Sequence, residues 1–498
     1  MQNGTLISLA IYFALMLAIG LYAYRVSSRN LSGYMLGGRS LGPGVTALSA
    51  GASDMSGWIL MGLPGAMYIT GLSSSWIVIG LIMGAYVNYL LVAPRLRIYT
   101  EIADDAITIP DYFENRFADK SRLLRIISSL VIIIFFTLYT SSGIVAGGKL
   151  FESAFGQSYE LGLYVTAGVV VIYTLFGGFL AVSMTDFVQG CIMFTALILV
   201  PLVALTDVGG LGNALRTVEQ INPHMLDMLQ GTTIIAIISS MAWGLGYFGQ
   251  PHIIVRFMAI RSVQQIKTAR RIGMSWMIVS VIGALATGLV GLAYATQQGL
   301  TDVDAETIFI VLSQLLFNPL VSGFLLAAVL AAIMSTISSQ LLVTSSSLTE
   351  DLYKTFIRKQ ATDLELVTVG RLSVVVVALV AIALAYNRDS TILSLVSNAW
   401  AGFGAAFGPV VLFSLFWKRM NAFGAIAGMI VGAVTVLLWI YAPLQINGRA
   451  LGDIIYEIVP GFILCSLTIW LVSLLTAAPD QTVLQRFSIM RQKLSDLA

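Results

Sequence analysis

Long apolar runs dominate this sequence and constrain what it can fold into. A helix that crosses a bilayer needs about 20 consecutive apolar residues, and thirteen such runs are present. They are roughly 5–24, 41–70, 74–93, 124–148, 159–178, 185–206, 232–255, 272–296, 318–345, 370–386, 391–416, 421–442 and 456–477. Only 10% of the residues are charged, whereas soluble domains carry about 25%. We therefore predict an all-α polytopic membrane protein with about 13 transmembrane helices in a lipid bilayer.

The basic residues between these runs predict the orientation. With the N-terminus outside, 23 of the 27 Lys and Arg residues, Arg256 among them, fall in inside segments. Only Lys149, Arg216, Arg388 and Arg449 then fall outside. Inside loops of membrane proteins carry an excess of Lys and Arg, so the prediction is N-out and C-in.

Composition excludes several classes of function. The net charge of +2 and the absence of a basic run argue against nucleic-acid binding. Two histidines and two widely separated cysteines argue against a His- or Cys-based metal centre. The sequence has no nucleotide-binding motif and no nucleophile elbow, so neither an enzyme nor an ATP-driven pump is predicted. No obligate protein partner is inferred.

The stretch 50–65, A-G-A-S-D-M-S-G-W-I-L-M-G-L-P-G, places the carboxylate of Asp54 inside the second apolar run. A charge at membrane depth is costly and usually faces a cavity or a partner. Four glycines and a proline in this stretch favour a discontinuous helix whose freed backbone groups bind a ligand. The alternative is a kinked helix in which Asp54 bonds a neighbouring hydroxyl for structural reasons.

A second interrupted run resembles the first. W-I-L-M-G-L-P-G begins at Trp58, and W-G-L-G-Y-F-G-Q-P-H begins at Trp243, five apolar runs later. Paired interrupted helices in two halves of a chain are typical of transporters with inverted repeats, in which the breaks bind the substrate. The similarity is short, so chance stays open as its explanation.

The ninth run carries a hydroxyl face. Ala332, Ser335 and Thr336 are spaced i, i+3 and i+4, so they share one face of a helix. Two hydroxyls and a carbonyl suit Na⁺, and the carbonyls of Ala52 and Met55 in the second run would complete such a site. The alternative is that both hydroxyls bond carbonyls of their own helix.

Three further positions are candidates for gating or ion passage. Asp186 opens the sixth run near the inside surface, as a cation relay or as a carboxylate at a helix N-terminus. Arg39 is interpreted first as a topology anchor and second as a gating residue. His252, directly after Pro251, is interpreted as an interfacial residue.

The residues around the two breaks are candidates for binding a substrate. The N–H groups at Ser56 and Gly57 would bind a carboxylate if a half-helix begins there. Tyr139, Trp243 and Tyr247 are aromatics inside apolar runs, where such residues usually form core packing. They become pocket residues only if their helices face the breaks.

Four sequence blocks carry a resemblance to a known family. They are Y-M-L-G-G-R-S-L-G-P with T-A-L-S-A-G-A-S-D-M-S-G-W, then W-G-L-G-Y-F-G-Q-P-H, M-S-T-I-S-S-Q-L-L-V and N-A-W-A-G-F-G-A-A-F-G-P-V-V-L-F. Through them the chain resembles the sodium:solute symporter family, and within it the proline-carrying branch, from about Gly33 to Arg486.

The resemblance implies a leucine-transporter-type fold with two inverted five-helix repeats. The expected division is 1–40 for the first membrane helix and inner loop, 41–206 for the first repeat and 207–231 for an outer loop. Residues 232–416 would form the second repeat, and 417–498 two accessory helices with a cytoplasmic tail.

The resemblance also implies the residues of the sites. Na⁺ would be bound by Ala52, Met55, Ala332, Ser335 and Thr336, with Asp54 and Asp186 linked to Na⁺. Proline would meet Ser56, Gly57, Tyr139, Trp243, Tyr247 and Pro251, and Arg39 would be the inner-gate residue.

The function implied is Na⁺-coupled import of L-proline through the bacterial inner (plasma) membrane by alternating access. Two alternatives stay open from the sequence. One is a family member for another small solute or one coupled to H⁺, and the other is a transporter-like sensor or channel.

Overall fold

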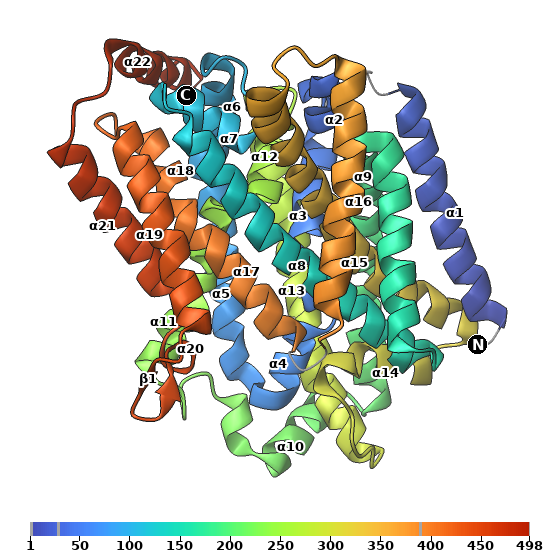
Figure 1. Cartoon of the computed structure of the whole chain (residues 1–498). Helices are drawn as coiled ribbons and strands as arrows, with labels where there is room; N and C mark the ends of the chain where they lie inside the picture. Colours follow the sequence, from blue (N-terminus) through green and yellow to red (C-terminus); the bar gives the residue numbers. More distant parts are fainter. Residues whose placement is uncertain (1–2, 27–29, 388–390, 498) are drawn as a thin grey trace.

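The computed structural model describes residues 3–26, 30–387 and 391–497. These residues are predominantly helical, and two strands of two residues each form one hairpin. Arg388, which the topology prediction assigns to an outside loop, lies outside the described residues. The helices form one bundle, with Asn3 at one end of it and α22 at the other (Figure 1).

The first part of the chain forms thirteen α-helices among the described residues. They are α1 (Asn3–Val26), α2 (Leu31–Leu36), α3 (Pro43–Met55), α4 (Gly62–Thr70), α5 (Ser75–Val87), α6 (Ala93–Ile102), α7 (Ile109–Phe117), α8 (Leu123–Phe155), α9 (Tyr159–Asp207), α10 (Leu211–Ile221), α11 (Ile234–Met241), α12 (Pro251–Ala259) and α13 (Ile266–Gln297).

The remainder adds nine α-helices and the hairpin. They are α14 (Ile308–Leu315), α15 (Pro319–Ser346), α16 (Asp363–Ala385), α17 (Ile392–Ala406), α18 (Gly408–Phe416), α19 (Ala422–Tyr441), β1 (Gln445–Ile446), β2 (Arg449–Ala450), α20 (Leu451–Ile454), α21 (Ile458–Leu475) and α22 (Gln481–Ser495).

Ten helical segments of the described chain are long and apolar enough to cross a membrane. The three predicted runs without a segment of their own are 41–70, whose second half belongs to the segment Gly57–Ile102, 159–178 and 232–255. In the first, α3 and α4 are separate short helices, and in the other two the apolar helices are Tyr159–Leu175 and Ile234–Phe248. A multi-pass membrane protein is confirmed, while the number thirteen stays a prediction.

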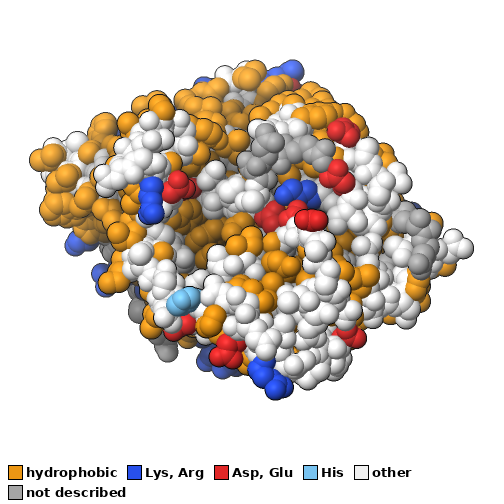
Figure 2. Space-filling model, turned by 90° about the horizontal axis from the view of Figure 1, so that it is seen from below, with side chains coloured by type: hydrophobic (Ala, Val, Ile, Leu, Met, Phe, Trp, Pro, Cys, Tyr) orange, Lys and Arg blue, Asp and Glu red, His pale blue; other side chains and the backbone are white. Residues whose placement is uncertain are grey.

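The two ends of the bundle form two faces. The N-terminal face carries the start of α1 together with α10, α14, α20 and the hairpin, and Figure 2 looks onto it. The C-terminal face carries α2, α6, α7 and α22 (Figure 1). The two ends of the described chain therefore lie on opposite faces, which agrees with an odd number of crossings.

Helix α15 is the central element of the core. It packs against α1, α3, α8, α9 and α16, and almost every residue from Leu325 to Leu342 is buried. A helix that is buried all round has no polar face to present to water. Its serines and threonines therefore face other helices, and this brings the hydroxyl face of α15 against α3.

Two helices are broken at the level of this core. Helix α3 ends at Met55 because Ser56 adopts φ +40°, and a short 3₁₀ turn, η2 (Gly57–Ile59), separates α3 from α4. Helix α11 passes into a 3₁₀ segment, η6 (Ala242–Phe248), before Pro251 starts α12 at its first position. Proline is favoured there because the first helical N–H has no partner within the helix.

Candidate functional site

The end of α3 and the hydroxyl face of α15 meet in the core. Ser335 Oγ donates a hydrogen bond to the carbonyl of Ala52 at 2.8 Å, and Thr336 Oγ1 lies 3.5 Å from the same oxygen. Both hydroxyls also lie near the carbonyl of Ala332, at 3.1 and 3.3 Å. Four of the five predicted Na⁺ ligands thus lie together.

The fifth predicted ligand, Met55, is the last residue of α3 and is buried. The last four carbonyls of a helix lack intrahelical partners and carry its negative dipole end. Ala52 and Met55 both belong to this group of four. The break at Ser56 therefore leaves carbonyl oxygens at the end of α3 without helical partners, and that of Ala52 faces the α15 hydroxyls.

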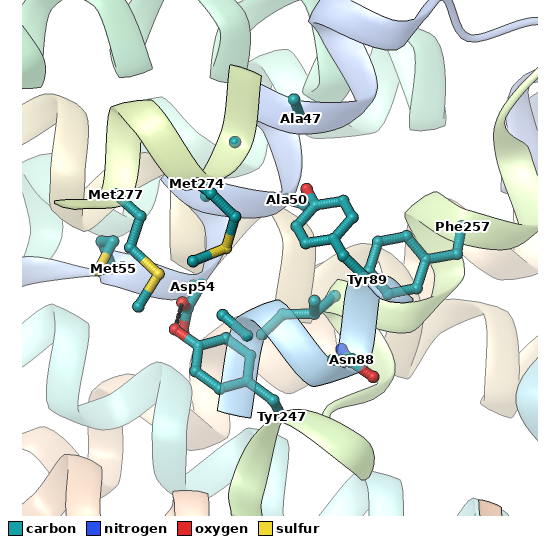
Figure 3. A pocket seen from close by; sticks show the side chains of 14 residues that line it. Ala47, Ala50, Asp54, Met55, Asn88, Tyr89, Tyr247, Phe257, Met274 and Met277 are labelled. Carbon is teal, nitrogen blue, oxygen red and sulfur yellow. Dashed lines mark hydrogen bonds between the residues drawn. The ribbon is translucent and has the colours of Figure 1, made fainter. Parts of the chain in front are cut away.

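Asp54 is buried beside this cluster, with 3% of its surface exposed. Its Oδ2 accepts a hydrogen bond from the Tyr247 hydroxyl at 2.5 Å (Figure 3). Its Oδ1 has no partner among the described residues. The partner hydroxyl comes from the second broken segment, η6, and not from a neighbour in sequence, so Asp54 links the two breaks directly.

A small cavity of about 20 Å³ lies next to Asp54, which is room for about one water molecule. Tyr89, Tyr247, Phe257 and the Asn88 amide contribute to its wall (Figure 3). Both polar atoms of the Asn88 side chain lack hydrogen-bond partners in the described part of the chain. Asn88 also begins a π-helical segment, η4 (Asn88–Val92), and such segments often occur at functional sites.

The predicted aromatic residues lie around η6. The ring of Trp243 packs 6.1 Å from that of Trp58, and the ring of Tyr247 packs edge-on against Trp400 at 5.1 Å. Trp400 also donates its indole N–H to the Trp243 carbonyl at 2.8 Å. These contacts place the predicted pocket aromatics against the first break.

Ser56 and Gly57 form the first break, and Tyr139 belongs to α8. Ser56 accepts a hydrogen bond from the Trp58 N–H at 3.3 Å. A Cβ at Gly57 would lie 3.1 Å from both Ala146 of α8 and Ile333 of α15, so glycine permits the close approach of these helices. The Tyr139 hydroxyl is buried without a partner among the described residues.

His252 and Pro251 are buried at the start of α12. The His252 ring packs edge-on against Tyr139 at 5.9 Å and against Phe136 at 5.3 Å. The prediction that His252 is interfacial is therefore wrong: α12 continues from the broken segment into the core, so its first turn faces aromatic side chains.

Asp186 lies inside α9 and is fully buried. Its Oδ2 accepts hydrogen bonds from Arg256 Nη2 at 3.1 Å and from Ser49 Oγ at 2.7 Å. Asp186 is thus not a carboxylate at a helix N-terminus, and its place near the inside surface stays a prediction. Arg256, predicted to lie in an inside loop, is also fully buried, because α12 carries it into the core as the partner of Asp186.

Arg256 connects Asp186 to the α15 hydroxyls. Its Nη2 donates to Ser339 Oγ at 2.6 Å, and Ser339 Oγ lies 2.9 Å from the carbonyl of Ser335. Sequence reasoning missed Arg256, Ser49 and Ser339 as site residues. The sequence did contain one sign of Arg256: it follows Pro251 by five residues and so falls within the first two turns of the helix that follows the break.

Arg39 lies at the C-terminal face between three segments. It bonds Asp105 Oδ1 at 3.0 Å, the carbonyl of Ala106 at 2.8 Å and that of Met258 in α12 at 2.7 Å. Burial lowers the pKa of its guanidinium, and Asp105 opposes that shift. Arg39 thus ties the segment before α3 to the end of α12.

Comparison with known proteins places these features in a family. The model of the sodium:solute symporter family matches residues 34–432. The chain is 60% identical over 494 residues to the osmoregulated proline transporter OpuE of Bacillus subtilis, covering 99% of each chain. It is 61% identical to the high-affinity proline transporter PutP of the same bacterium, over 96% of this chain and all of that one. It is 56% identical to sodium/proline symporter 2 of Staphylococcus saprophyticus, over 98% of this chain and 96% of the relative.

The fold also matches solved structures. A Na⁺-coupled sialic acid symporter in an outward-open state superimposes with a TM-score of 0.82 at 19% identity, over 96% of this chain and 99% of that one. A nucleobase-cation-symport-1 family transporter in a closed conformation superimposes with a TM-score of 0.56 at 13% identity, over 91% and 98%. Family model, relatives and fold agree, and the chain belongs to the sodium:solute symporter family.

Proposed function

We propose that this protein imports L-proline together with Na⁺ through the bacterial plasma membrane by alternating access. One observation carries the proposal: the end of broken helix α3 meets the hydroxyl face of α15 through Ala52, Ser335 and Thr336. The names of relatives that are about 60% identical over nearly the whole chain support proline as the substrate.

The proposed arrangement in the membrane is thirteen crossings, N-out and C-in, with the N-terminal face outside. Residues 41–206 and 232–416 are the two inverted repeats, 1–40 precede them, 207–231 connect them outside and 417–498 follow. The breaks at Ser56 and at η6 occupy equivalent places in the two repeats, which supports this division.

Na⁺ binds between α3 and α15 in this mechanism. The carbonyls of Ala52, Met55 and Ala332 and the hydroxyls of Ser335 and Thr336 supply oxygen ligands, and the negative end of α3 adds to the attraction. In the structure the two hydroxyls lie close to the Ala52 carbonyl. On ion binding they turn their lone pairs to the ion, and Na⁺ replaces those contacts while holding the helices together.

Proline binds at the two breaks, next to Ser56. Its carboxylate meets the backbone at Ser56 and Gly57, and its ring packs against Trp243 and Tyr247, with Tyr139 and Pro251 completing the wall. In the structure the Trp243 ring packs against Trp58 and the Tyr247 ring against Trp400, so entry of proline requires the two breaks to separate.

Asp54 and Asp186 are linked to Na⁺ in different ways. Asp54 bonds Tyr247 and so makes the shape of the α3 break depend on the segment that binds proline. Asp186 acts through Arg256 and Ser339 on the helix that carries Ser335. Because both ligands favour one conformation, each strengthens binding of the other by the same factor.

Release occurs at the C-terminal face, where Arg39 is the gate. Its bonds to Asp105, Ala106 and Met258 would break when that face opens. A membrane potential contributes about 2.3 kcal/mol per 100 mV for each charge carried inward.

Uptake of labelled proline into proteoliposomes with an imposed Na⁺ gradient tests the proposal. We expect labelled proline to accumulate and this accumulation to stop when K⁺ replaces Na⁺. We also expect excess unlabelled proline to compete for uptake better than other amino acids do. Uptake driven by a proton gradient, or better competition by another solute, would favour the alternative family function. Ohmic currents without accumulation would favour a channel.

The ion site is tested separately by the double variant Ser335→Ala, Thr336→Val. We expect it to lose Na⁺-induced thermal stabilisation. The matched control is Thr344→Val, Ser346→Ala on the same helix, where both hydroxyls bond carbonyls one turn earlier. Equal Na⁺ stabilisation in both double variants would refute the assignment.

A further inference from the structure

The C-terminal helix α22 is docked on the C-terminal face of the bundle. It packs against α6 and α7, and Figure 1 shows it lying at that end of the molecule. Its buried residues Val483, Phe487 and Met490 are spaced i, i+4 and i+7, which is the pattern of one apolar helix face. The other positions of α22 are mostly exposed. A single row of apolar side chains therefore holds α22 against the bundle.

A buried arginine of α7 stabilises this row. Arg116 is fully buried, and its guanidinium carbon lies 5.4 Å from the centre of the Phe487 ring and 4.9 Å from that of the Tyr99 ring in α6. The rings of Phe487 and Tyr99 also pack edge-on at 6.4 Å. A cation beside an aromatic face is attracted by the ring, and the attraction is stronger where water is excluded. These contacts fix the middle of α22 beside the last turn of α6.

The loop that follows α6 carries two consecutive aspartates in the left-handed backbone region. Asp104 has φ +55° and Asp105 has φ +53°, a conformation that is costly for a residue with a side chain and persists only where the surroundings hold it. The two carboxylates bind different elements. Asp104 Oδ1 accepts a hydrogen bond from Arg486 Nη2 of α22 at 2.7 Å, and Asp105 Oδ1 accepts one from Arg39 Nε at 3.0 Å. One strained loop therefore joins the C-terminal helix to Arg39.

Further hydrogen bonds extend this connection on both sides. Arg486 Nη1 donates to the carbonyl of Asn115 in α7 at 3.0 Å, and Asn115 Nδ2 donates to the carbonyl of Ala103 in the loop at 3.3 Å. Beyond the loop, Arg39 donates to the carbonyl of Met258 in the last turn of α12 at 2.7 Å. The series of contacts thus runs from α22 through the loop and Arg39 to the helix that follows the second break.

We propose that α22 is a latch for the gate at the C-terminal face and that Arg486 is a positioning residue for Arg39. Docked α22 holds the loop in the conformation in which Asp105 binds Arg39, so loss of the Arg486–Asp104 pair weakens the hold of Arg39 on α12 and favours opening of this face. The pair is partly exposed, so it can break without disturbing the core. The inference rests on the proposed function, because that function makes Arg39 the gate.

The rate at which a cysteine behind the gate reacts with a maleimide tests the latch. Ala47 of α3 is fully buried and lines the small cavity beside Asp54 (Figure 3), so the variant Ala47→Cys reports opening. The exposed Cys191 is replaced by serine, and the buried Cys465 of α21 is kept as an internal measure of general loosening. The full-length protein is purified in nanodiscs and labelled in K⁺ buffer without proline.

We expect Arg486→Gln and Asp104→Asn each to raise the labelling rate of Ala47→Cys about threefold to tenfold, because a partly exposed ion pair with charge-assisted hydrogen bonds is lost. Asparagine keeps the size of Asp104 and tolerates the left-handed backbone. The labelling rate of Cys465 should stay unchanged. The matched control Arg491→Gln, exposed on the same helix, should change neither rate.

The variant Arg39→Gln separates the latch from the gate. It should raise the labelling rate of Ala47→Cys at least as much as Arg486→Gln does, and combining the two should give no further increase, because Arg486 acts through Arg39. An unchanged rate in Arg39→Gln contradicts the gate of the proposed function, and the latch with it.

Three outcomes overturn the latch alone. One is a faster rate in Arg39→Gln without any increase in Arg486→Gln and Asp104→Asn. The second is a double variant in which the effects of Arg39→Gln and Arg486→Gln multiply. The third is an equal increase at Cys465, since α22 would then act on general stability. Should Arg486→Gln fail to fold, Asp104→Asn decides, because Asp104 is exposed in its loop.

Discussion

Removing the Arg256 guanidinium tests whether the pair with Asp186 is the structural link between α9, α12 and α15. Both side chains are fully buried, and Arg256 bonds Asp186, Ser49, Ser339 and its own helix at His252 O. The variant Arg256→Met introduces an apolar side chain of similar length and leaves the carboxylate with Ser49 as its remaining hydrogen-bond partner among the described residues.

The expected magnitude follows from charge burial. Removing one partner of a buried ion pair costs about 3–5 kcal/mol, because an uncompensated charge remains. Replacing both partners by neutral groups is often nearly neutral for stability. We therefore expect Arg256→Met to lower the free energy of unfolding by about 3–5 kcal/mol, and Arg256→Met with Asp186→Asn to regain more than half of this loss.

The assay is unfolding by sodium dodecyl sulfate in mixed micelles, followed by circular dichroism, for both single variants and the double variant. Arg271→Met, exposed on α13, is the control and should change stability by less than about 0.5 kcal/mol. The reasoning is refuted if the double variant loses at least as much free energy of unfolding as the two single variants lose together. In that case neither single variant would have left an uncompensated charge.

Two further predictions concern the breaks. Asp54→Asn should raise the Na⁺ concentration for half-maximal uptake roughly tenfold or more, because a charged hydrogen-bond acceptor for Tyr247 is lost beside the ion site; an unchanged Na⁺ titration of uptake would contradict this. Gly246→Ala should destabilise the protein by about 1–3 kcal/mol, since its Cβ would lie 1.9 Å from Trp400 Nε1. The Cβ of Gly168→Ala in α9 meets open space, so this variant should raise the free energy of unfolding by about 0.5–1 kcal/mol in the same unfolding assay. Similar effects of the two glycine variants would count against a tight η6–α17 contact.

The spanning helices were predictable because apolar length is a local property of the sequence. The breaks were predictable as well, since glycine and proline act on the backbone where they stand. The meeting of Ala52 with Ser335 was a prediction from helix periodicity and resemblance together. Periodicity places Ser335 and Thr336 on one face of a helix, but it does not say which helix lies opposite.

The partners of the charged residues were not predictable from local patterns. Arg256 follows a helix start and precedes a basic loop, so its sequence context is that of an inside anchor. Its burial depends on Asp186, 70 residues earlier, and on Ser339, 83 residues later.

The contacts of Asp54 and Asp186 show what two carboxylates beside the proposed ion site do in the structure. In the structure each carboxylate bonds a side chain from the second broken segment or from the helix after it, Tyr247 in η6 and Arg256 in α12. Ser335 and Ser339 of α15 complete the same network. In the proposed mechanism, an ion that draws α3 and α15 together therefore acts on the segment that carries the aromatic wall of the proposed substrate site. Neutral oxygens would bind Na⁺ there, and the buried charges would connect that binding event to the position of η6 and α12.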